Sequence, residues 1–98
     1  IKFLDNLRLL EELDLSENYF RKDDGEFMQN SRGLKILKLR NCNFRSIERN
    51  FLNFSNFPQL NYLDLSYNKL EYISSEMISS LSILQVLLLS HNSLTDFN

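Results

Sequence analysis

Few residues of this chain could do covalent chemistry. The 98 residues include one histidine, His91, and one cysteine, Cys42, with no Gly-Lys-Ser phosphate loop and no His-Glu-x-x-His pair. Ser90 precedes His91, but adjacent strand residues point to opposite sides, so they do not readily form a nucleophile–base pair. We therefore expect no enzyme activity, cofactor or metal site. His91 is interpreted as a solvent-exposed residue, with a pH-sensitive partner contact as the alternative.

Cys42 cannot form a disulfide within the chain, because it has no second cysteine to pair with. A cysteine at a buried position is usually a small hydrophobic residue. A metal-binding thiol would need further ligands, and His91 is the only histidine. We interpret Cys42 as a core residue, with a reactive thiol as the weaker alternative.

Composition indicates a single structural unit and argues against two classes of partner. With 43% hydrophobic and 24% charged residues and a net charge of -2, the chain gives no electrostatic reason to bind nucleic acid. The longest purely apolar run, 86–89, is far shorter than the roughly 20 residues of a membrane-spanning helix. Charges also come too early in "IKFLDNLRLL" for a signal peptide. Any signal or membrane anchor is expected in segments outside this chain.

A repeated pattern organises the sequence. "LNYLDLSYNKL" begins at residue 60, and three similar stretches, "LEELDLSENYF", "LKILKLRNCNF" and "LQVLLLSHNSL", begin at residues 10, 34 and 84. The four starts are therefore 24, 26 and 24 residues apart. This spacing and pattern are typical of leucine-rich repeats. We divide the chain into a partial repeat 1–9, repeats 10–33, 34–59 and 60–83, and a partial repeat 84–98, and expect a segment of a longer array.

Each repeat predicts one short strand. In "YLDLS", Leu63 and Leu65 alternate with Tyr62, Asp64 and Ser66, so the leucines share one face of the strand and the variable residues share the other. Copies about 24 residues apart can stack as a parallel sheet when the chain returns along the opposite side each time. The sequence therefore predicts an α/β solenoid, a right-handed coil with short parallel strands on its concave face and loops or short helical turns on its convex face.

The position after each strand is predicted to turn into the core. Asn18, Asn68 and Asn92 occupy it in three repeats, where an amide can pair backbone groups of the turn and of the next coil. Cys42 occupies it in the second repeat, and sulfur is a weaker hydrogen-bonding partner, so we expect the weakest ladder there.

The return segments are less regular than the strands. In the third repeat, Ile73, Ile78 and Leu81 are expected to point inward around one helical turn in "SSEMISSL". In the second repeat, aromatic residues three apart are expected to pack on the convex side, with Pro58 stopping any helix: Phe51, Phe54 and Phe57. In the first repeat, an exposed excursion is expected in which Phe27 or Met28 carries the packing.

The stretches "LDLSEN", "LDLSYN" and "LLLSHN" resemble the leucine-rich repeat family, in particular its extracellular variety with repeats of about 24 residues. That variety is found in Toll-like receptor ectodomains, insect secreted immune proteins and small leucine-rich proteoglycans. The resemblance implies non-enzymatic protein recognition by part of an extracellular receptor or a secreted immune or adhesion protein. The alternative is a cytoplasmic scaffold or regulatory subunit, and a third class is an array attached to a catalytic domain outside this chain.

The outward strand residues are the candidate partner-binding set, because they line the concave face in columns from coil to coil. A protein ligand or co-receptor is the expected partner. One interpretation is that the charged residues neutralise one another, with Lys38 and Arg40 pairing with Asp14 and Asp64. A second interpretation is that the apolar residues form the core of a protein interface. The candidates are Glu12, Asp14, Ile36, Lys38, Arg40, Tyr62, Asp64, Tyr67, Val86, Leu88 and His91.

Asn53 begins "NFS", an acceptor sequence for an N-linked sugar on the long return of the second repeat. A glycan there would cover the convex side and leave the concave face for the partner. Its use depends on secretion, so we treat Asn53 as a possible glycosylation site of an extracellular protein.

Overall fold

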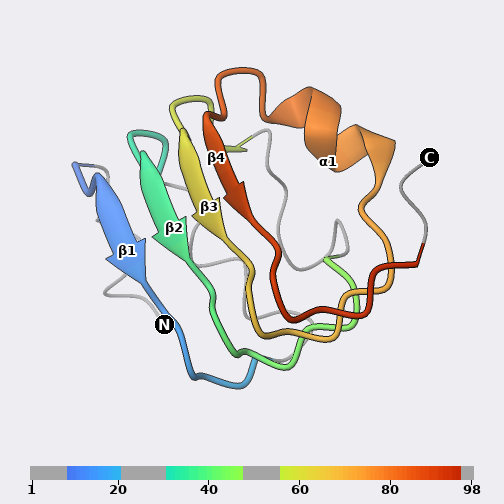
Figure 1. Cartoon of the computed structure of the whole chain (residues 1–98). Helices are drawn as coiled ribbons and strands as arrows, with labels where there is room; N and C mark the ends of the chain where they lie inside the picture. The colour runs from blue at the N-terminus through green and yellow to red at the C-terminus, as the bar shows by residue number, and fades with distance from the viewer. Residues whose placement is uncertain (1–8, 21–30, 48–55, 96–98) are drawn as a thin grey trace.

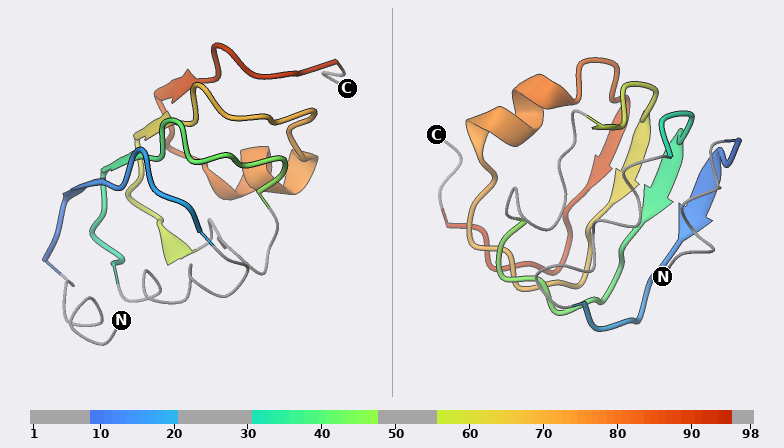
Figure 2. Two further views of the ribbon diagram at one scale, coloured as in Figure 1. Left: turned by 90° about the horizontal axis from the view of Figure 1, so that it is seen from below. Right: turned by 180° about the vertical axis from the view of Figure 1, so that it is seen from behind.

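The computed structural model describes residues 9–20, 31–47 and 56–95, and these residues form a solenoid built on one parallel sheet. The four strands follow one another across the sheet in chain order (Figure 1). They are β1 (Glu12–Asp14), β2 (Ile36–Lys38), β3 (Tyr62–Asp64) and β4 (Val86–Leu88). After each strand the chain turns toward the other side of the core, and the described residues that follow β2, β3 and β4 run along similar paths (Figure 2).

The register of the sheet aligns equivalent repeat positions, which confirms the predicted columns. Every pair of neighbouring strands is parallel, and each strand contributes one residue to each of three rows. The central row is leucine throughout, because the period of two turns this position toward the interior. The two flanking rows point the other way. The rows are Glu12, Ile36, Tyr62 and Val86; Leu13, Leu37, Leu63 and Leu87; and Asp14, Lys38, Asp64 and Leu88.

The repeated leucines make a continuous core. Leu37 and Leu63, at the centres of the two inner strands, are 0% exposed, whereas Leu13 and Leu87 on the outer strands are partly buried. Burying a leucine side chain contributes about 1.5–3 kcal/mol, so stacking several such layers stabilises strands of only three residues each. Phe57 is buried in the same cluster, as predicted. Phe51, Phe54, Asn53 and the excursion around Phe27 and Met28 lie outside the described residues.

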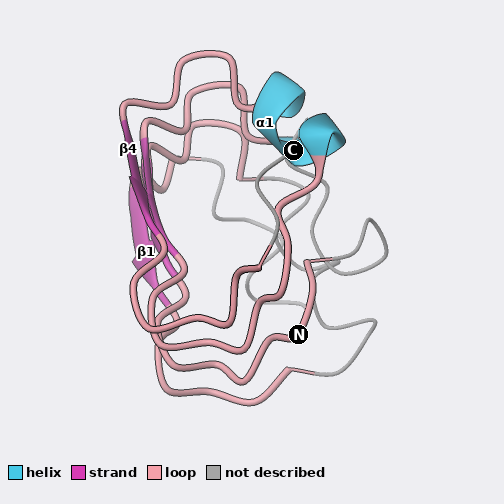
Figure 3. Ribbon diagram, turned by 45° about the vertical axis from the view of Figure 1, so that its right-hand side comes forward, coloured by secondary structure: helices cyan, strands magenta, loops and turns pink. Residues whose placement is uncertain are grey.

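The third return contains one short helix, α1 (Ser75–Ser80), which lies across the core from the strands (Figure 3). Ser74 caps its N-terminus, because its side-chain oxygen accepts a hydrogen bond from the Met77 N–H at 3.2 Å. The predicted inward position of Ile78 is wrong, since this residue is 51% exposed. Leu81 is buried as predicted, and Met77, four residues before it, is buried in place of Ile78.

Each strand leads into a tight turn with the same backbone conformation. Glu17, Asn41, Tyr67 and His91 are equivalent positions, and all have left-handed φ values between 54° and 63°. This conformation is uncommon for residues with a Cβ atom. The turn recurs in all four coils, and the residue after it is buried at Cys42 and Asn68, partly buried at Asn92 and exposed at Asn18.

Asn68 joins two coils from within such a turn, as predicted. Its Oδ1 accepts the backbone N–H groups of Cys42 at 2.9 Å and Phe44 at 3.1 Å. Its Nδ2 donates to three carbonyls at 3.0, 2.9 and 3.2 Å, those of Leu39, Leu65 and Ser66. The side chain therefore pairs groups that the turns would otherwise bury without partners.

Cys42 occupies the equivalent position one coil earlier. It is a free, buried cysteine, in agreement with its interpretation as a core residue. Its Sγ lies 3.4 Å from the Leu15 carbonyl oxygen and 3.5 Å from that of Arg40. A thiol is a weak donor at these distances, so this turn is held less firmly than the turn at Asn68.

Candidate functional site

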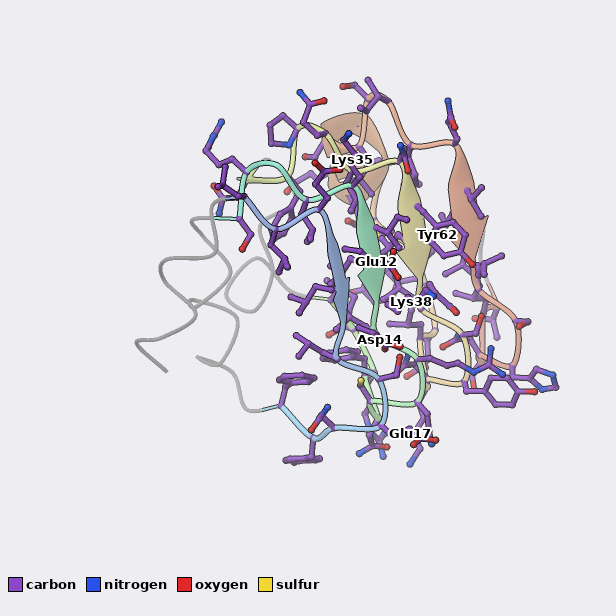
Figure 4. The ribbon with its side chains drawn as sticks, turned by 90° about the vertical axis from the view of Figure 1, so that its left-hand side faces the viewer. Glu12, Asp14, Glu17, Lys35, Lys38 and Tyr62 are labelled. Carbon is purple, nitrogen blue, oxygen red and sulfur yellow. The ribbon has the colours of Figure 1, made fainter. Side chains whose placement is uncertain are left out.

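The candidate site is the face of the sheet turned away from the core, which we call the open face. It consists of the outward residues of the four strands: Glu12, Asp14, Ile36, Lys38, Tyr62, Asp64, Val86 and Leu88. Figure 4 shows Glu12, Asp14, Lys38 and Tyr62 on this face, with Glu17 beyond the end of β1. Because these side chains stand on short strands anchored by buried leucines, their spacing is fixed by the sheet.

The open face is hollowed. A depression of about 660 Å³ crosses the strands and takes residues from all four coils. Most of the predicted candidates on this face line it, which brings charged residues of the first two coils together with a tyrosine and a leucine of the last two. Its lining residues are Asp14, Ser16, Glu17, Lys38, Arg40, Tyr62, Asp64 and Leu88.

Charge pairing on this face follows a pattern different from the predicted one. Arg40 pairs with Asp64 as expected, with Nη1 and Oδ2 4.0 Å apart. Lys38 does not pair directly with Asp14 or Asp64. Its Nζ lies 3.9 Å from Oε2 of Glu12, which is two residues before its register partner Asp14 on the neighbouring strand. The Lys38–Glu12 pair is exposed, and such a pair contributes about 0–1 kcal/mol, so it organises the face more than it stabilises the fold.

Asp64 is the clearest correction among the candidate residues. It was expected to be a free outward side chain, yet it is 5% exposed. Its Oδ1 accepts a hydrogen bond from the Ser66 N–H at 2.9 Å, so the carboxylate closes the turn that follows β3. Ser66 is also buried. The Asp-x-Ser order at the end of the strand indicates this turn contact, but it does not indicate the burial of Asp64, since Asp14 has the same order and is exposed.

Asp14 makes the same turn contact in the first coil but remains exposed. Its Oδ1 accepts a hydrogen bond from the Ser16 N–H at 3.0 Å. Hydrogen bonds from the Ser16 side chain and backbone, with Lys38 nearby, hold the pKa of Asp14 below its usual value. The carboxylate therefore stays ionised and accessible at neutral pH.

The apolar part of the face lies over the later strands. Tyr62, Val86 and Leu88 are partly buried, and Ile36 extends this group onto β2. Among them Tyr62 and Leu88 border the hollow directly. Partly exposed apolar side chains beside charged ones are what the centre of a protein interface resembles, with tyrosine a common anchor.

Three side chains stack on one another just after the C-terminal ends of β2, β3 and β4. The Arg40 guanidinium carbon lies 4.5 Å from the centre of the Tyr67 ring. His91 stacks with Tyr67 at 4.2 Å between ring centres and an angle of 15°. Sequence reasoning selected all three residues but not the stack, because left-handed turns carry Tyr67 and His91 out of the strand alternation.

The described residues offer no metal cluster, and the Ser90 hydroxyl is directed at another serine and not at His91. No group of three or more His, Cys, Asp or Glu side chains in residues 9–20, 31–47 and 56–95 could hold an ion. The Ser90 hydroxyl donates to the Ser66 hydroxyl at 3.2 Å, while His91 stacks on Tyr67. In the same ranges, no helix has the length and apolar character needed to cross a membrane.

Two family models match the chain. Both are described as leucine rich repeat, one over residues 32–94 and the other over residues 9–30. No curated protein matches the chain. The longer match covers more than half of the sequence and includes β2, β3, α1 and β4. Together with the parallel sheet and its repeated leucines, these matches show that the chain belongs to the leucine-rich repeat family, whose repeats serve as protein-interaction modules without a catalytic role.

Proposed function

We propose that the open face binds a protein partner, and that the chain is part of an extracellular receptor or of a secreted immune or adhesion protein. The observation that supports partner binding is the difference between the inward and outward faces of the sheet. The inward row is leucine in all four strands, whereas one outward row has a different residue in every coil and the other combines aspartate, lysine and leucine around a hollow. A rigid surface with changing side chains suits recognition of a particular partner.

The extracellular assignment is supported by the resemblance of "LDLSEN" and "LDLSYN" to the variety with repeats of about 24 residues. The cytoplasmic scaffold remains the competing proposal. Treating natively expressed protein with an N-glycosidase distinguishes the two. We expect a mass decrease that Asn53→Gln abolishes. An unchanged mass would favour the cytoplasmic alternative.

Selection from a phage library of random linear peptides tests the binding face. The parent full-length protein serves as bait, and the enriched peptides are then measured on a double variant, Tyr62→Ala with Leu88→Ser. Both residues border the hollow, so the variant should lose most of the binding while its circular dichroism and unfolding midpoint stay close to those of the parent.

A matched control removes the same types of side chain elsewhere. Tyr72 and Ile83 are exposed and do not line the hollow. The double variant Tyr72→Ala with Ile83→Ser should keep the selected peptides bound. If both double variants bind equally well, or if the control loses binding instead, the open face is not the recognition surface.

A further inference from the structure

The open face is asymmetric in charge, which allows the chemistry of its partner to be specified; this inference rests on the proposed function. The carboxylates of Glu12, Asp14 and Glu17 belong to the first coil. The later end of the same hollow is bordered by Tyr62 and Leu88. A ligand lying across the strands therefore meets acid at one end and apolar surface at the other.

The cations of the hollow do not cancel this polarity. Lys38 is drawn to Glu12 at 3.9 Å. Arg40 is engaged by Asp64 at 4.0 Å and by the Tyr67 ring at 4.5 Å. The hollow's lining contains three carboxylates, those of Asp14, Glu17 and Asp64, against the two cations Lys38 and Arg40.

Asp14 and Glu17 are the acids left for a ligand. Both are exposed, and neither forms an ion pair within 4.0 Å in the part of the chain that the structure describes. In Figure 4 Glu17 lies beyond Asp14, farther from Lys38 along the first coil. A cation entering from that end meets Glu17 and then Asp14 before it reaches the Lys38 ammonium.

We propose that the open face takes an extended segment of a partner protein, with a lysine or arginine beside Asp14 and Glu17 and an apolar side chain on Tyr62 and Leu88. Asp14 and Leu88 belong to the same row, three strand spacings apart. At about 4.8 Å per spacing this distance is roughly 14 Å, which an extended chain covers in about four residues. The basic and apolar residues of the partner segment are therefore about four positions apart.

The peptide selection described above tests this chemistry. Peptides enriched on the parent protein should carry a lysine or arginine about four positions from a leucine, isoleucine, phenylalanine or tyrosine. Their affinity should fall as salt is added, because exposed charge pairs are screened. Selection on Asp14→Lys with Glu17→Lys should instead enrich acidic residues at the same spacing.

Single-charge variants provide a matched comparison with one selected peptide. Glu17→Gln should weaken it about threefold, and Asp14→Asn with Glu17→Gln about tenfold. Asn at position 14 keeps an oxygen for the Ser16 N–H, so the turn is preserved. Glu71→Gln removes an exposed acid that does not line the hollow and should leave the affinity unchanged.

The outcomes separate this inference from the proposed function. Peptides that need Tyr62 and Leu88 but lack a basic residue, or that are acidic, would overturn the inference and leave the proposed function standing. The same conclusion follows if Glu17→Gln and Glu71→Gln have equal effects. If no selected peptide depends on Tyr62 and Leu88, both are overturned.

Discussion

The two faces of one sheet follow opposite rules. On the inner face, the register aligns Leu13, Leu37, Leu63 and Leu87, a single residue type in four coils. On the open face, the neighbouring row changes in every coil: Glu12, Ile36, Tyr62 and Val86. Uniformity marks the side where each coil must fit its neighbours, since a core tolerates little change in volume. Variation marks the side where a coil can acquire a partner without altering the stack.

Leu63→Ala should produce the largest effect and would sharpen the contrast between the faces. Leu63 is 0% exposed, and removing its side chain leaves a cavity between coils, so the free energy of unfolding should fall by about 3 kcal/mol. Tyr62→Ala, one residue earlier on the open face, should cost less than half as much. Urea unfolding of both variants measures the difference, and equal losses would break the comparison.

Asn68→Ala tests the turn that supports the face. Removing the amide leaves backbone groups of two coils without partners, whereas Tyr67→Ala removes a partly exposed ring and keeps a Cβ atom at the left-handed position. Asn68→Ala should therefore lower the free energy of unfolding by about 1–3 kcal/mol more than Tyr67→Ala. Denaturant unfolding supplies the measurement. A smaller loss for Asn68→Ala would mean that the amide does not hold the coils together.

Cys42→Asn should extend the same support to the first coil. The thiol lies 3.4 Å from the Leu15 carbonyl oxygen, which an amide could reach with a stronger hydrogen bond, as Asn68 does one coil later. We expect a gain of about 1 kcal/mol in thermal or urea unfolding. Cys42→Ser is the matched control, because its hydroxyl is too short to bridge both turns. A loss in both variants would show that this turn is built around sulfur.

The smallest expected effect is that of Asp14→Asn on the pH dependence of the free energy of unfolding in acid. The pKa of Asp14 is lower in the folded chain, so its contribution is present above the unfolded pKa and is lost as pH falls through the folded pKa. Asp14→Asn should flatten this acid limb, below about pH 4, because the variant lacks the small contribution of the ionised carboxylate at neutral pH and matches the parent in acid. Unfolding midpoints of parent and variant across this range provide the test. An unchanged acid limb would contradict the stated role of the Ser16 hydrogen bonds.

Much of the architecture was predictable from the sequence because it depends on spacing alone. The four strands, their parallel order and the alignment of Tyr62 with Ile36 and Val86 all follow from the repeat. Which side chain of α1 faces the core was not predictable, since one short helical turn can present either Met77 or Ile78 to it. Packing against the neighbouring coil decides between them.

The candidate site was predicted in outline and corrected in detail. Strand alternation places Asp64 outward, but the turn contact to Ser66 and the Arg40 side chain cover it. The stack of Arg40, Tyr67 and His91 depends on left-handed turns that no spacing rule indicates. What the alternation could not supply is the path of the chain after each strand ends.

The most direct test of the account is a saturation mutational scan of residues 60–70, read once for protein abundance and once for binding of a selected peptide. The account predicts low abundance for most substitutions at the inward positions Leu60, Leu63, Leu65, Asn68 and Leu70. It predicts normal abundance with weakened binding at Tyr62. The account would be contradicted if Tyr62 variants were depleted like Leu63 variants, or if they kept full binding.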